Sequence, residues 1–132
     1  MSISSPMILI GPERVGKSTV GQLLAARLGL PFIDVRQRAA SYYAELGHSQ
    51  AAVDQAWDAG LEGFLHYQAP FEVHAIERFL QEQSSPGVFE LGASQVVLTD
   101  DKLAARLKQA LQPYQRIVLL LPSPDNEASI RV

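Results

Sequence analysis

Cysteine is absent from this 132-residue chain, which excludes a disulfide framework, a cysteine-based zinc site and a thiol nucleophile. Positive charge is scarce, because 11 Lys and Arg stand against 14 Asp and Glu and give a net charge of -3. A broad basic surface for nucleic acid is therefore not expected. The longest apolar run, Ile117 to Leu121, is far shorter than the ~20 residues of a membrane span. We expect a cytoplasmic protein without a nucleic-acid or membrane partner.

The length of the chain bounds its organisation. At 132 residues it is shorter than the ~150 residues typical of one domain, so the sequence predicts a single domain over residues 1–132. Hydrophobic residues make up 47% and charged residues 19% of the chain, as in ordinary globular proteins. The chain therefore has enough apolar side chains to form one core.

Short apolar runs alternate with segments of helical periodicity. Strands are predicted at 7–10, 32–35, 88–91 and 117–121, and helices at 18–28, over most of 38–83, and from about 101 to 111. The helical middle is expected to break at Gly47, Gly60, Gly63 and Pro70. The last strand does not alternate, which predicts that it is fully buried. Together these elements predict a three-layer α/β/α domain with a mainly parallel sheet.

The turn between the first strand and the first helix carries a phosphate-binding motif. It reads Gly11-Pro12-Glu13-Arg14-Val15-Gly16-Lys17-Ser18, a complete match to the P-loop pattern, and Thr19 follows. In such a loop the glycines let backbone N–H groups surround a phosphate, and the helix N-terminus adds its positive dipole. Lys17 is predicted to neutralise the β- and γ-phosphates, and the Ser18 hydroxyl to ligate Mg²⁺. We therefore expect residues 11–19 to bind ATP.

Two acids are candidates for holding the metal ion. Asp34 ends the second predicted strand and Glu90 lies in the third, so both are expected at the carboxyl edge of the sheet, where α/β proteins bind ligands. An acid in an apolar strand needs a cation or hydrogen bonds, which Mg²⁺-bound water or Lys17 would supply. Asp34 is the first candidate for holding Mg²⁺. It is also the candidate for accepting the proton of a hydroxyl acceptor. The alternative for Glu90 is a frayed strand end that pairs with solvent.

These residues resemble a known family. From the P-loop through Thr19-Val20-Gly21, Leu24-Ala25, Leu28-Gly29 and Phe32-Ile33-Asp34, the chain is similar to the start of a shikimate kinase, a small P-loop kinase. Residues 88–94 resemble that family's third strand and glycine triplet, and residues 117–122 its fourth strand. The resemblance implies a parallel sheet of order 2-3-1-4-5 and transfer of the ATP γ-phosphate to a small hydroxyl acceptor. It also implies that Lys17 holds the phosphates and that Ser18 and Asp34 serve Mg²⁺.

Departures from the family pattern fall on the acceptor side. The second acid of the family's Asp-x-Asp motif is replaced by Arg36, and the glycine triplet reads Gly92-Ala93-Ser94. The segment from Ala39 to Glu77, where the family has its substrate-carboxylate arginine, contains no Lys or Arg. It does contain six acids, which would repel an anionic carboxylate. We therefore expect an acceptor other than shikimate.

The lid and the last strand of the family would follow Val132. On this basis we expect the 132 residues to be a C-terminally truncated form that lacks the fifth strand. A second hypothesis is a nucleotide-binding regulatory or interaction module without kinase activity. A nucleotide-dependent rate with an acceptor would separate the two hypotheses.

Overall fold

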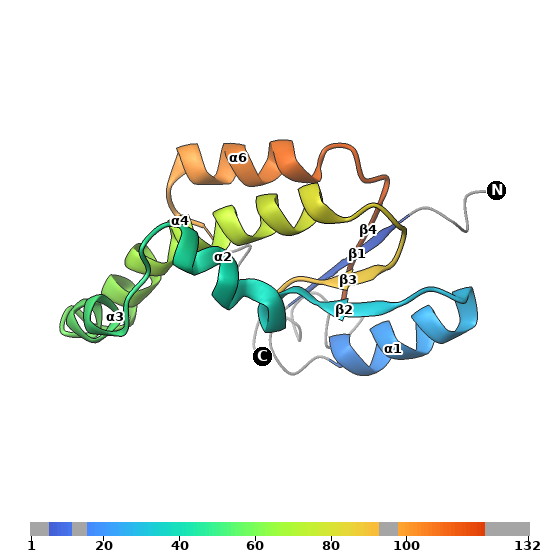
Figure 1. The fold of residues 1–132 in the computed structure, drawn as a ribbon, viewed down its shortest axis with the longest axis horizontal. Helices are drawn as coiled ribbons and strands as arrows, with labels where there is room; N and C mark the ends of the chain where they lie inside the picture. The colour runs from blue at the N-terminus through green and yellow to red at the C-terminus, as the bar shows by residue number, and fades with distance from the viewer. Residues whose placement is uncertain (1–5, 12–15, 93–97, 121–132) are drawn as a thin grey trace, which may run out of the picture. The chain divides into compact units, whose positions relative to one another are not determined.

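A computed structural model describes residues 6–11, 16–92 and 98–120 of the chain (Figure 1). The chain divides into two compact units. The first contains Met1–Asp34, Ser85–Ala93 and Tyr114–Val132, and the second contains Val35–Ser84 and Ser94–Pro113.

The first unit is built on a four-stranded, all-parallel sheet of order β2-β3-β1-β4. Its strands are β1 (Met7–Ile10), β2 (Phe32–Asp34), β3 (Val88–Glu90) and β4 (Arg116–Leu119). The α/β class, the parallel pairing and the order of these four strands confirm the sequence prediction. Because the strands are parallel, their carboxyl ends meet at one edge of the sheet.

Helix α1 (Lys17–Leu28) packs on β1, β2 and β3 (Figure 1). Buried Leu9, Ala25 and Val88 form a core between helix and sheet, with Phe32 packed against it. The closest approach is at Gly21, where an added Cβ would lie only 2.4 Å from the Phe32 ring. The absence of a side chain at Gly21 therefore sets how near α1 stands to the sheet.

Strand β4 differs from the prediction of full burial. Ile117, Val118 and Leu119 are 41%, 36% and 58% exposed. The physical reason is its position, because among the described residues β4 pairs with β1 alone and so stands at the edge of the sheet. A continuous apolar run predicts neighbours on both sides, and here only one is described.

The second unit consists of helices. They are η2 (Val35–Arg38), α2 (Ala39–Glu45), α3 (Gln50–Trp57), α4 (Gly60–Glu82) and α6 (Asp101–Leu111). The long helix α4 is the centre of this unit, since η2, α2, α3 and α6 all pack against it. Helix α6 begins as predicted, with the Asp100 carboxylate accepting a hydrogen bond of 2.9 Å from the Leu103 N–H.

Helix α4 also corrects the sequence prediction. It runs unbroken through Gly63 and Pro70, where breaks were expected. An added Cβ at Gly63 would lie 2.5 Å from the Ala56 carbonyl oxygen, so this glycine allows α3 and α4 to approach closely. The buried residues of α4 all follow Pro70, which indicates that packing holds the helix together beyond the proline. No helix in the described ranges is long and apolar enough to cross a membrane.

Candidate phosphate and metal site

The site lies in the first unit, where β1 ends and α1 begins. Gly16 is the N-cap of α1 with φ +87°, a left-handed conformation that glycine adopts without strain. At Gly11 an added Cβ would lie 2.5 Å from the carbonyl oxygen of Leu120, so no side chain fits there. Each position therefore favours glycine, Gly16 for its left-handed conformation and Gly11 for the close approach of another backbone segment. Pro12, Glu13, Arg14 and Val15, also predicted to bind phosphate, lie outside the described residues.

Lys17 is the first residue of α1 and is buried, with 6% of its surface exposed. Its Nζ donates a hydrogen bond of 2.9 Å to the carbonyl oxygen of Gly11. The ammonium group is therefore folded back over the start of the loop. The N–H groups in the first turn of a helix point toward its N-terminal end, and in α1 this turn begins at Lys17. Ammonium and helix dipole both favour an anion at this position.

Ser18 contacts one of the two candidate acids. Its Oγ donates a hydrogen bond of 2.7 Å to Oε1 of Glu90, which ends β3 and is only 4% exposed. The two residues are 72 positions apart in the sequence. Burial and this bond rule out the alternative in which Glu90 is a frayed strand end paired with solvent.

Asp34 lies beside Glu90 in the sheet. The two residues are in register at the ends of the neighbouring parallel strands β2 and β3. Residues in register on parallel strands direct their side chains to the same face. Asp34 is partly exposed, whereas Glu90 is buried. The fold therefore brings both predicted acids to the same sheet edge, and the hydroxyl of Ser18 to one of them.

The donor set suits a hard cation. The Ser18 hydroxyl and the Glu90 carboxylate supply oxygen atoms, which Mg²⁺ prefers, and Asp34 offers another carboxylate in the adjacent register position. Within the described ranges no group of three or more His, Cys, Asp or Glu side chains could hold a metal ion. An ion at this edge would therefore need oxygens from a ligand such as a phosphate, as is usual for Mg²⁺ in phosphoryl transfer.

Each of these residues was predicted from the sequence to belong to the site, but the contacts among them were not. Ser18 and Glu90 were each predicted to serve Mg²⁺, and their direct hydrogen bond was not foreseen. The available signal was the acid at the end of a strand that is otherwise apolar and buried, because such a carboxylate requires a polar partner.

The sequence is similar to those of known shikimate kinases. A shikimate kinase of Streptomyces coelicolor is 33% identical over 130 residues, covering 98% of this chain and 64% of the relative. A shikimate kinase of Psychrobacter cryohalolentis is 36% identical over 76 residues, 58% of this chain and 36% of the relative. The chain thus spans less than two thirds of the length of these relatives. No family model matches.

Solved structures give the same result for the fold. A shikimate kinase from Acinetobacter baumannii in complex with shikimate superposes with a TM-score of 0.58 at 22% identity, over 93% of this chain and 59% of that one. A shikimate kinase from Bacteroides thetaiotaomicron gives a TM-score of 0.53 at 21% identity, over 88% and 56%. The resemblance to the shikimate kinase-like P-loop kinases is thereby confirmed, and with it the P-loop kinase fold.

Proposed function

We propose that this chain, which is similar to shikimate kinases, binds ATP at its P-loop and transfers the γ-phosphate to a small hydroxyl acceptor. The proposal rests on the arrangement at the junction of β1 and α1. Lys17 and Ser18 begin the helix there, and the Ser18 hydroxyl donates a hydrogen bond of 2.7 Å to Glu90. The proposal treats residues 1–132 as one P-loop kinase-like domain. It assigns phosphate binding to residues 11–19.

Lys17 would act on the phosphates. When nucleotide binds, its Nζ exchanges the Gly11 carbonyl oxygen for β- and γ-phosphate oxygens, a contact between full charges in place of one with a dipole. The N–H groups of the first turn of α1 stay fixed in the helix and need no rearrangement to meet the phosphate. Catalysis here would consist of positioning and charge neutralisation.

Ser18, Asp34 and Glu90 would hold Mg²⁺ together with the phosphates. The ion, when bound, neutralises charge that develops on the transferred group. Glu90 orients the Ser18 hydroxyl through the bond already present. Asp34 is less buried than Glu90, so we assign it the further role of accepting the proton of the attacking hydroxyl.

The acceptor is proposed to differ from shikimate. Arg36 follows β2 at the position of the family's second acid, and no Lys or Arg occurs between Ala39 and Glu77. Without a cation in that segment, an anionic acceptor would lack the partner that usually fixes a carboxylate. We therefore propose a neutral or cationic hydroxyl compound.

Release of ADP tests the proposal. The chain is incubated with Mg²⁺-ATP and one acceptor at a time, namely shikimate, gluconate, glycerol and ethanolamine. The account predicts acceptor-dependent ADP release that Asp34→Asn reduces by about a hundredfold or more, as for loss of a general base. Glu82→Gln, an exposed acid in α4, serves as the control and should leave the rate unchanged. Nucleotide binding without any acceptor-dependent rate would instead support the regulatory or interaction module.

A further inference from the structure

The second unit contains a pocket of about 710 Å³ that lies against the first half of α4. Leu61, Leu65 and Ala69 form its apolar part, and Leu61 and Leu65 are 60% and 38% exposed. Its polar groups are the carboxylate of Glu62, the imidazole of His66 and the hydroxyl of Thr99. The volume falls in the range of small-molecule sites, about 300 to 1,000 Å³.

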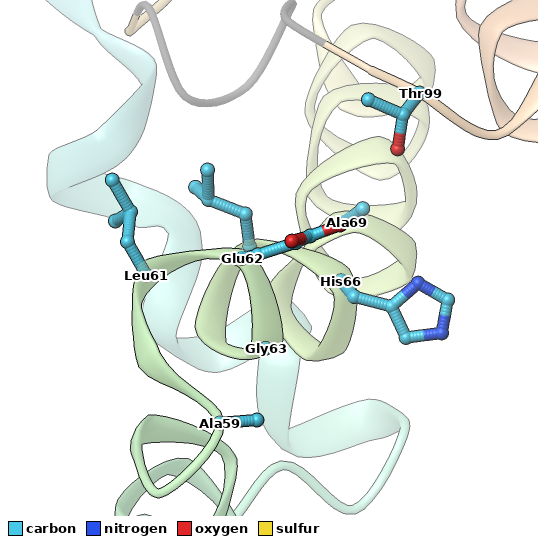
Figure 2. A pocket seen from close by; sticks show the side chains of 8 residues that line it. Ala59, Leu61, Glu62, Gly63, His66, Ala69 and Thr99 are labelled. Atoms are coloured by element: carbon cyan, nitrogen blue, oxygen red, sulfur yellow. The ribbon is translucent and has the colours of Figure 1, made fainter.

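The polar groups are arranged on one side of the pocket. Figure 2 shows Glu62 and His66, one helical turn apart on α4, projecting to the side on which Thr99 lies. The Thr99 hydroxyl is directed toward α4, and Leu61 lies on the opposite side of Glu62. The carboxylate therefore stands between an apolar wall and a wall that can form hydrogen bonds.

Glu62 lacks a cationic partner, in contrast to Glu45 and Glu77 of the same unit. Glu45 accepts a hydrogen bond of 3.0 Å from Arg78, and Glu77 pairs with Arg106 at 2.5 Å. Among the described residues Glu62 has neither a hydrogen-bond nor an ion-pair partner. The described residues that line the pocket include no Lys or Arg. Its one full charge is thus the negative charge of Glu62, which is unpaired within the described part of the chain.

We infer that this pocket binds a small organic cation, an ammonium group attached to an apolar carbon skeleton. The ammonium group donates to the Glu62 carboxylate, with Thr99 and His66 as further hydrogen-bonding partners. The carbon skeleton covers the exposed faces of Leu61 and Leu65 and removes them from water. An anionic ligand of the same shape is rejected, because it would meet an unpaired carboxylate.

Amide spectra of the ¹⁵N-labelled chain test this site with 2-phenylethylamine as the cationic probe. The probe should shift the amides of residues 59–69 and Thr99, and 2-phenylethanol, which has the same skeleton and no charge, should bind about three- to tenfold more weakly at low ionic strength. Equal affinity for the amine and the alcohol, or shifts spread over other parts of the chain, would overturn the inference. Neither titration requires nucleotide, so its outcome is independent of the proposed kinase activity.

Two variants sharpen the test. Glu62→Gln should reduce the affinity for 2-phenylethylamine by about three- to tenfold and leave that for 2-phenylethanol unchanged. Asp54→Asn is the matched control, because this exposed acid of α3 bonds Gln50 and does not line the pocket. Equal affinities of the Glu62→Gln and wild-type chains would contradict the site. Concentration-dependent broadening of the pocket amides without probe would show that a second copy of the chain occupies it, and would overturn the inference as well.

Discussion

The hydrogen bond between Ser18 and Glu90 joins α1 to β3, and its removal has a predictable cost. Glu90 is 4% exposed, and among the described residues Ser18 is the side-chain partner of its carboxylate. A charge-assisted hydrogen bond contributes about 1.5 to 3 kcal/mol, more than a neutral one. Ser18→Ala removes the donor and leaves the carboxylate buried. We therefore expect the free energy of unfolding to fall by about 1.5 to 3 kcal/mol.

A double-mutant cycle separates this bond from other effects of the substitution. In a Glu90→Leu background, which replaces the acid by an apolar group of similar size, Ser18→Ala should be nearly neutral. Thr19→Ala, at the exposed neighbouring position of α1, is the control for helix propensity and should change stability little in either background. Urea unfolding of the four chains measures the coupling free energy. If Ser18→Ala lowers the free energy of unfolding equally in both backgrounds, the reasoning is refuted.

The remaining predictions concern packing and pH. Gly21→Ala should lower the free energy of unfolding by about 1 to 3 kcal/mol, because its Cβ would lie 2.4 Å from the Phe32 ring. Gln22→Ala, on the exposed face of α1, is the control and should not lower it. Urea unfolding of both variants measures the two changes in free energy. Hydrogen bonds from Arg78 and then His74 hold the pKa of Glu45 below its ordinary value of 4.5. The resulting stabilisation is present above pH 4.5 and is lost as the pH falls through the lowered pKa, so Glu45→Gln should flatten the acid limb of a stability-against-pH curve. An unchanged acid limb would exclude the contacts of Glu45 with Arg78 and His74 as a source of acid sensitivity.

Local sequence signals were enough to predict the β1–α1–β2 part of the fold. Gly29, with φ +70°, ends α1 where the sequence placed the helix stop. The alternation of short apolar runs with segments of helical periodicity also predicted the parallel sheet. The helix stop and the strand and helix periodicities depend on neighbours within a few residues, which a single sequence displays directly.

Features that depend on distant partners were not predictable in the same way. Gly63 was expected to break a helix, yet it allows Ala56 of α3 to approach α4. Pro70 was expected to do the same, yet the helix continues into its most buried part. In both cases tertiary packing decides the outcome, and local propensity does not.

At the site, the sequence identified the residue types and the fold supplied their pairing. Lys17, Ser18, Asp34 and Glu90 each carried a recognisable signal, either a motif or an acid at a strand end. The strand order implied by the family resemblance places β3 between β1 and β2, but it does not show that the side chains of Ser18 and Glu90, 72 positions apart, form a hydrogen bond. The register of Asp34 with Glu90 follows from the same order.

The central claim is that the junction of β1 and α1 binds the phosphates of ATP through Lys17. Calorimetric titration of Mg²⁺-ATP into the wild-type chain and into Lys17→Ala measures it most directly, with Lys102→Ala, an exposed lysine of α6, as the control. Loss of a charge-assisted contact of about 1.5 to 3 kcal/mol predicts an affinity roughly ten- to hundredfold weaker for Lys17→Ala and an unchanged affinity for the control. Thermal unfolding checks that both chains are folded. Equal affinities of folded wild type and folded Lys17→Ala for Mg²⁺-ATP would contradict the account.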